Sequence, residues 1–125
     1  MAFDSLKHGL GAENFPALAG EDLTGAQYKA VQLTGTGVRY AVDVASGRVV
    51  VCYNTPSSGQ AVTAYGAGHV VKAKSGGALT PGAYVTITGS STFTSVGSPF
   101  FGAVGNVYST GSTTSGDIVS IRLIY

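Results

Sequence analysis

The chain has 125 residues, of which seven are basic and six acidic, so its formal net charge is +1 and its charged fraction is 10%. An average soluble domain has about 25% charged residues, whereas a disordered chain combines high charge with few apolar residues. A hydrophobic share of 44% excludes a disordered chain and predicts one folded domain with its own core. The scattered charges also exclude the clustered lysines and arginines that nucleic-acid binding requires.

Residues 1–20 are expected to form an extended arm that precedes the domain. Glycines at positions 9 and 11 disfavour a helix there. The arm has spaced apolar residues that are candidate contacts with a partner: Phe3, Leu6, Leu10, Phe15 and Leu18. Two interpretations stay open, namely a tail that packs on its own domain and an arm that reaches a neighbouring subunit or another protein.

No targeting or membrane segment is predicted. The N-terminal stretch has no basic start followed by an apolar run, so it is unlike a signal peptide. No apolar run approaches the length of a membrane-spanning helix. We therefore expect a protein that is made in the cytoplasm and has no membrane partner.

Short runs with β-branched or aromatic residues at every second position predict an all-β chain of eight or nine strands. These runs cover residues 27–34, 38–44, 48–53, 61–65, 69–74, 83–88, 90–95, 103–108 and 118–125. Within residues 56–89, glycine-containing breaks separate three runs and predict a meander, with a type II turn at Pro81-Gly82. The even spacing and the glycine-rich turns favour a barrel or a sandwich.

The run RVVVCY at residues 48–53 is almost continuously apolar, which predicts a strand covered on both faces. A loop, the arm or another subunit could provide the outer cover, so Val49, Val51 and Tyr53 are further candidate contact residues. Cys52 is the only cysteine, which excludes a disulfide within the chain. We interpret it as a small buried or half-buried side chain and not as a reactive thiol.

No catalytic or metal-binding motif is recognisable. His8 and His69 lack cysteine or carboxylate neighbours at the spacing of metal ligands. The adjacent acids at positions 21–22 are interpreted as a solvated turn, because a catalytic pair must face a shared cleft. Lys72 and Lys74 fall on one face of a predicted strand and are interpreted as a wet edge. We expect no enzyme activity, no cofactor and no metal.

A pattern of strands, loops and glycines runs through residues 20–125. It comprises GEDLTG at 20–25, NTPSSG at 54–59, QAVT at 60–63, GHVVKA at 68–73, GGALTPG at 76–82 before Val85, and Gly116-Asp117 before the last apolar strand. This pattern resembles the small head decoration (capsid cement) proteins of tailed bacteriophages. Residues 1–19 of the arm are not part of the resemblance.

The resemblance implies a β-barrel or β-tulip-like domain spanning residues 21–125. It implies a viral structural protein on the outer capsid surface of the virion, often a homotrimer, that bridges subunits of the major capsid protein. It brings no catalytic residue and no cofactor. Two alternatives remain: another virion module, such as a tail, fibre or head-fibre base domain, and a free-standing module that binds glycans or peptides.

Overall fold

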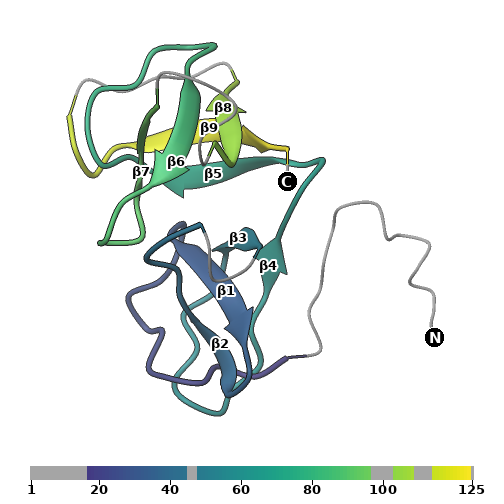
Figure 1. Cartoon of the computed structure of the whole chain (residues 1–125). Coiled ribbons are helices and arrows are strands. Elements are labelled where there is room, and N and C mark those ends of the chain that lie inside the picture. The colour runs from purple at the N-terminus through teal and green to yellow at the C-terminus, as the bar shows by residue number, and fades with distance from the viewer. Residues whose placement is uncertain (1–16, 45–47, 97–102, 109–113, 125) are drawn as a thin grey trace.

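The computed structural model describes residues 17–44, 48–96, 103–108 and 114–124, and in these ranges the chain forms nine strands and no helix (Figure 1). The strands are β1 (Ala30–Thr34), β2 (Gly37–Tyr40), β3 (Val49–Cys52), β4 (Ala64–Tyr65), β5 (Val70–Lys74), β6 (Tyr84–Ile87), β7 (Phe93–Ser95), β8 (Gly105–Val107) and β9 (Ile118–Leu123). Each strand overlaps one of the predicted runs. The prediction of an all-β chain with eight or nine short strands is confirmed.

The strands form two antiparallel sheets, which lie one above the other in Figure 1. The first has the order β2-β1-β3-β4 and the second the order β5-β9-β8-β6-β7. The predicted meander is wrong, because β4 pairs with β3, β5 pairs with β9, and β6 pairs with β7 and β8. Turn residues determine where the chain reverses, but the partner of a strand depends on which apolar faces can be buried together.

The predicted type II turn is present between β5 and β6. Ala83 N donates to Thr80 O over 3.1 Å, with Pro81 and Gly82 as the central residues. Gly82 has a φ of +89°, the left-handed conformation that this turn type requires at its third residue. The turn could therefore be predicted from its local sequence, although the two strands that it connects do not pair with each other.

Isolated bridges, and not continuous ladders, join the outer edges of each sheet. In the five-stranded sheet Ser75, after β5, bridges Phe93 of β7. In the four-stranded sheet Leu18 bridges Ala61, and Ala19 bridges Val38 of β2. Both sheets are thus curled, but the described strands form no closed barrel. Residues 17–20 also belong to the edge of the first sheet and not to a separate arm.

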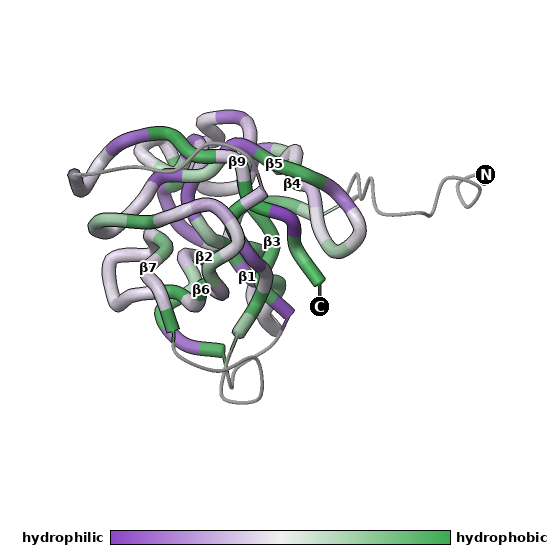
Figure 2. Tube along the Cα trace, turned by 90° about the horizontal axis from the view of Figure 1, so that it is seen from above, coloured by the Kyte–Doolittle hydropathy of each residue, from purple (hydrophilic) through white to green (hydrophobic). Residues whose placement is uncertain are grey.

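Strand β3 is buried along its whole length, as the apolar run at residues 48–53 predicted. Val49 and Val51 point into the larger core, which both sheets share. Val50 and Cys52 point into a smaller core within the four-stranded sheet. Figure 2 shows the continuous hydrophobic character of β3. The cover on both faces therefore comes from the chain itself, and burying each valine contributes about 1.5–3 kcal/mol.

Backbone groups of β5 join the two sheets. Lys72 N donates to Tyr53 Oη over 2.6 Å, and Lys74 N donates to Tyr28 O over 2.8 Å. The rings of Tyr28 and Tyr53 meet edge to face with centroids 5.2 Å apart, and Tyr65 packs on Tyr53 at 4.8 Å. The backbone edge of β5 is consequently covered, which protects it from pairing with another chain.

Candidate functional site

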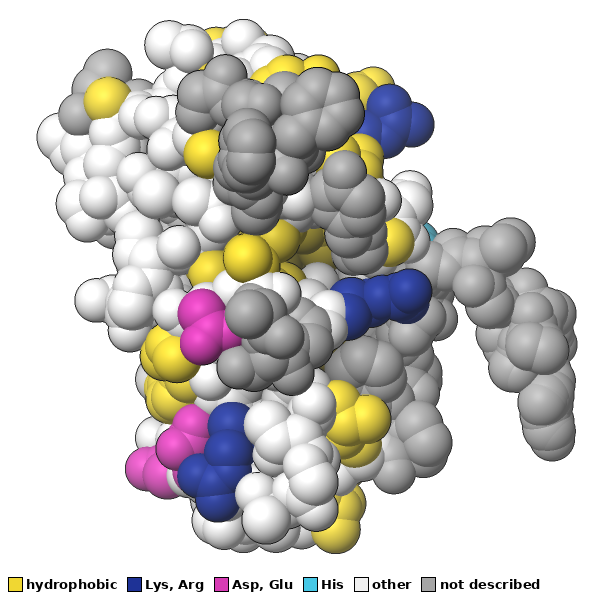
Figure 3. Space-filling model, in the orientation of Figure 1, with side chains coloured by type: hydrophobic (Ala, Val, Ile, Leu, Met, Phe, Trp, Pro, Cys, Tyr) yellow, Lys and Arg dark blue, Asp and Glu magenta, His cyan; other side chains and the backbone are white. Residues whose placement is uncertain are grey.

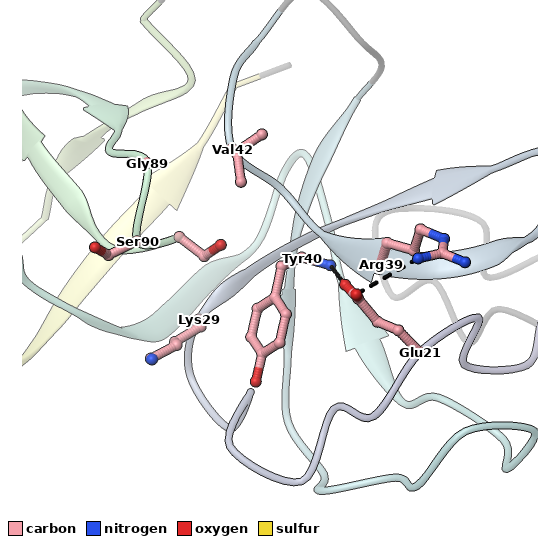
Figure 4. A pocket seen from close by; sticks show the side chains of 8 residues that line it. Glu21, Lys29, Arg39, Tyr40, Val42, Gly89 and Ser90 are labelled. Carbon is pink, nitrogen blue, oxygen red and sulfur yellow. Dashed lines mark hydrogen bonds and ion pairs between the residues drawn. The ribbon is translucent and has the colours of Figure 1, made fainter.

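A cleft of about 580 Å³ opens between the two sheets (Figure 4). The first sheet and its flanking turns contribute most of the wall, and the loop between β6 and β7 contributes the rest. Its lining residues are Glu21, Lys29, Arg39, Tyr40, Val42, Gly89, Ser90 and Ser91. Both halves of the fold are therefore needed to form the cleft.

Glu21 covers the outer edge of β2 beyond the bridge between Ala19 and Val38. Its Oε2 accepts a hydrogen bond of 2.8 Å from Tyr40 N, and its Oε1 lies 3.5 Å from Arg39 Nη1 (Figure 4). The interpretation of residues 21–22 as a solvated turn is therefore wrong for Glu21, because its carboxylate satisfies a backbone donor that a neighbouring strand would otherwise pair with. The interpretation as a solvated turn fits Asp22, which is exposed and accepts a hydrogen bond of 3.1 Å from Thr24 N.

Lys29 and Tyr40 form the centre of the cleft. Lys29 Nζ lies 5.9 Å from the centroid of the Tyr40 ring, within the range of a cation–π contact. Burial raises the pKa of Tyr40 above 10.0, and the negative charges of Asp22 and Glu21 raise it further. The phenol consequently stays neutral at physiological pH. For polar contacts the cleft offers the Lys29 ammonium, the Arg39 guanidinium that is paired with Glu21, a neutral phenol and the exposed Ser90.

Ser91 holds the wall of the cleft in place. Its Oγ donates to Ala41 O over 2.7 Å, and its carbonyl accepts from Ala30 N over 2.8 Å. Ser91 is only 2% exposed and has a φ of +65°, which is uncommon for a residue with a side chain. The β6–β7 loop is thus attached to the first sheet by two buried hydrogen bonds.

Cys52 is enclosed by the fold, whereas His69 is partly exposed. Cys52 is fully buried, its Sγ lies 3.3 Å from Asn54 O, and burial raises the pKa of the thiol. The His69 ring lies 5.7 Å from that of Tyr65, and its Nε2 is buried without a hydrogen-bond partner among the described residues. In the described ranges no group of three or more metal-ligating side chains comes together. The same ranges hold no helix long and apolar enough to cross a membrane.

The residues that were predicted to contact a partner differ in their exposure and in whether the structure describes them. Phe3, Leu6, Leu10 and Phe15 lie outside the described residues. Leu18 is 55% exposed and is available to a partner.

Val49 and Val51 are 3% and 0% exposed, so the prediction that they contact a partner is wrong. The five-stranded sheet already packs against the face for which a loop, the arm or another subunit was the expected cover. Tyr53 is half-buried at the junction of the sheets, where its hydroxyl is bonded to β5.

Sequence reasoning missed the outer face of the five-stranded sheet. Val70, Tyr84 and Ile118 are 46%, 39% and 40% exposed on this face. The signal lay in the alternation of β9, where Ile118 is on the same face of the strand as the polar Ser120 and Arg122. The residues between them are buried on the other face. Apolar residues on the polar side of an alternating strand were the available indication of a contact surface.

No protein-family model matches the chain, and no curated protein matches it.

Proposed function

We propose that this protein is a capsid decoration protein, which binds the outer surface of a phage head and stabilises contacts between subunits of the major capsid protein. Within this proposal the two curled sheets correspond to the barrel-like or β-tulip-like domain that the resemblance implies. The bridges at Ser75–Phe93 and Leu18–Ala61 support a partly closed form of each sheet.

Segments that carry the resemblance also contact one another. Leu23 N, in the segment at residues 20–25, donates to Pro56 O over 2.9 Å. Gly116 N donates to Ser75 O over 2.8 Å, just before the segment at residues 76–82. The pattern is therefore distributed over contacts of one folded unit, which supports treating it as a structural signature.

The exposed apolar surface is the observation that carries the proposal. Large hydrophobic side chains that are more than a third exposed occur in both halves of the fold, in strands and in the segments between them: Leu18, Leu33, Val42, Val44, Val70, Tyr84, Tyr108, Ile118 and Ile124. Few charges accompany them, since only 10% of the residues are charged. Such a surface suits association with other proteins. Many copies on one lattice add up modest contacts, so a decoration protein needs a rigid scaffold and no reaction.

The proposal assigns the protein to the virion, after synthesis in the host cytoplasm, with the major capsid protein and further copies of itself, as a homotrimer, as its partners. The test uses purified protein and expanded heads of the source phage that lack it. We expect saturable cosedimentation with the heads, a higher temperature of head disruption, and a trimer by native mass spectrometry. Electron microscopy then distinguishes copies over the whole lattice from copies at one vertex or on the tail. Absence of both head binding and oligomers would overturn the proposal.

A further inference from the structure

The outer face of the five-stranded sheet combines cations with exposed apolar side chains. We call it the basic face and define it by Val70, Lys72, Lys74, Tyr84, Ile118 and Arg122. The strand register places these residues side by side, because Arg122 of β9 is opposite Val70 of β5 and opposite Asn106 of β8. Tyr84 of β6 continues this row beyond Asn106.

A second row lies further along the sheet. Lys74 of β5 is opposite Ile118 of β9, and Lys72 is opposite Ser120 between the two rows. Directly opposite residues have Cβ atoms about 5 Å apart. Each apolar residue of β5 and β9 on this face therefore has a cation as its cross-strand neighbour.

The charge of this face is not compensated within the described residues. Lys72, Lys74 and Arg122 are all the basic residues between positions 64 and 124, and no ion pair joins them to a described acid. Asp117 is the one acid in that part of the sequence, and its Oδ2 accepts a hydrogen bond of 3.1 Å from Thr114 Oγ1. In the view of Figure 3 the acidic side chains lie over the four-stranded sheet and none is seen over the five-stranded sheet.

The composition of the face decides between possible occupants. A second copy that used the same face would place lysines and arginine against each other, which disfavours a symmetric dimer through it. Nucleic acid would meet only three cations and one ring for stacking, that of Tyr84, while the aliphatic Val70 and Ile118 offer it neither stacking nor phosphate contacts. A protein surface that carries carboxylates between apolar side chains matches both components of the face.

We propose that the basic face binds an acidic, partly apolar protein surface. This inference rests on the proposed function and names the docking side: the five-stranded sheet faces the major capsid subunits, whose contact surface presents Asp and Glu. Salt screens exposed charges, so the attraction between the basic face and its acidic partner surface weakens steeply as the salt concentration rises. Exposed charge pairs of this kind act mainly on the association rate.

The test compares two variants with the same change in charge. Arg122→Glu reverses a cation on the basic face, and Arg48→Glu reverses an exposed cation that belongs to the other half of the fold. Both substitutions are at exposed positions, so both variants should melt within a few degrees of the parent. Binding to expanded heads that lack this protein is measured by cosedimentation at low and high salt, and binding to a single-stranded DNA oligonucleotide by fluorescence anisotropy.

We expect Arg122→Glu to weaken head binding by about tenfold or more at low salt, with a smaller effect at high salt, and Arg48→Glu to change it less than about threefold. Heads that bind the parent and Arg122→Glu equally would overturn the inference and leave the proposed function intact. Heads that do not bind the parent would overturn the inference, and a parent that also forms no oligomer would overturn the proposed function as well. DNA binding that Arg122→Glu abolishes, with head binding unchanged, would assign the face to nucleic acid and refute the protein partner.

Discussion

The hydroxyl of Ser91 provides the sharpest test of how the two sheets are held together. It donates to Ala41 O over 2.7 Å, and Ser91 and Ala41 are 2% and 0% exposed. In Ser91→Ala the carbonyl of Ala41 loses this donor in a place that water does not reach. Leaving a buried polar group unsatisfied costs about 1–3 kcal/mol. The φ of +65° is unchanged, so backbone strain is nearly equal in both proteins.

This loss translates into a measurable shift of the melting temperature. Unfolding entropies near 2.1 cal/mol/K per residue imply a fall of roughly 4 °C for each kcal/mol in a chain of this length, so we expect Ser91→Ala to melt about 4–12 °C below the parent. The matched control is Ser90→Ala in the same loop, where the side chain is exposed and the change should stay within about 0.5 kcal/mol. Thermal unfolding followed by circular dichroism measures both. Equal melting temperatures for the two variants would refute the assignment of this hydrogen bond as a structural link.

Three further predictions test the core and the N-terminal boundary. Val51→Asp should prevent folding, because a buried unpaired carboxylate costs several kcal/mol; a cooperative melt near that of the parent would contradict the burial of β3. Burial raises the pKa of Tyr53 above 10.0, so the fold favours the neutral phenol, and this contribution is complete below pH 10.0 and lost as the pH rises through the raised pKa. The melting temperature of the parent should fall as the pH rises above the raised pKa, and it should fall less in Tyr53→Phe. If the melting temperature depended on pH equally in both proteins, Tyr53 would not be the source of this pH dependence. Deleting residues 1–16 should leave the melting temperature nearly unchanged. Deleting residues 1–19 should lower it, because Ala19 N donates to Gln60 O over 2.8 Å. Equal melting temperatures for the two deletions would show that the contacts of residues 17–19 do not stabilise the fold.

The junction between the sheets explains how a chain with so few charges keeps its strand edges covered. Tyr53 Oη and Tyr28 O accept from the edge of β5, and Glu21 accepts from the edge of β2. An unpaired strand edge is a template for aggregation, and natural proteins often protect it with charged side chains. Here hydrogen bonds from within the chain cover parts of the β5 and β2 edges, and at β2 the acceptor is the charged side chain of Glu21.

The strand positions and the main turn could be predicted from the sequence because both depend on local chemistry. Alternation places every second side chain on one face, and Pro81-Gly82 prefers one turn geometry. The burial of β3 on both faces was predictable for the same reason, since no polar residue interrupts Val49–Cys52. These features involve neighbours within a few residues.

The pairing of strands and the composition of both candidate surfaces were decided only by the tertiary structure. β5 pairs with β9, although the chain between them also forms β6, β7 and β8. That pairing turns Lys72, Lys74 and Arg122 into one face, where the sequence showed two lysines on a wet strand and a distant arginine. It also places the buried face of the five-stranded sheet against Val49 and Val51, which removes them from any contact surface. The physical reason is that burial energy is shared between distant segments, whereas turn and strand propensities are read from adjacent residues.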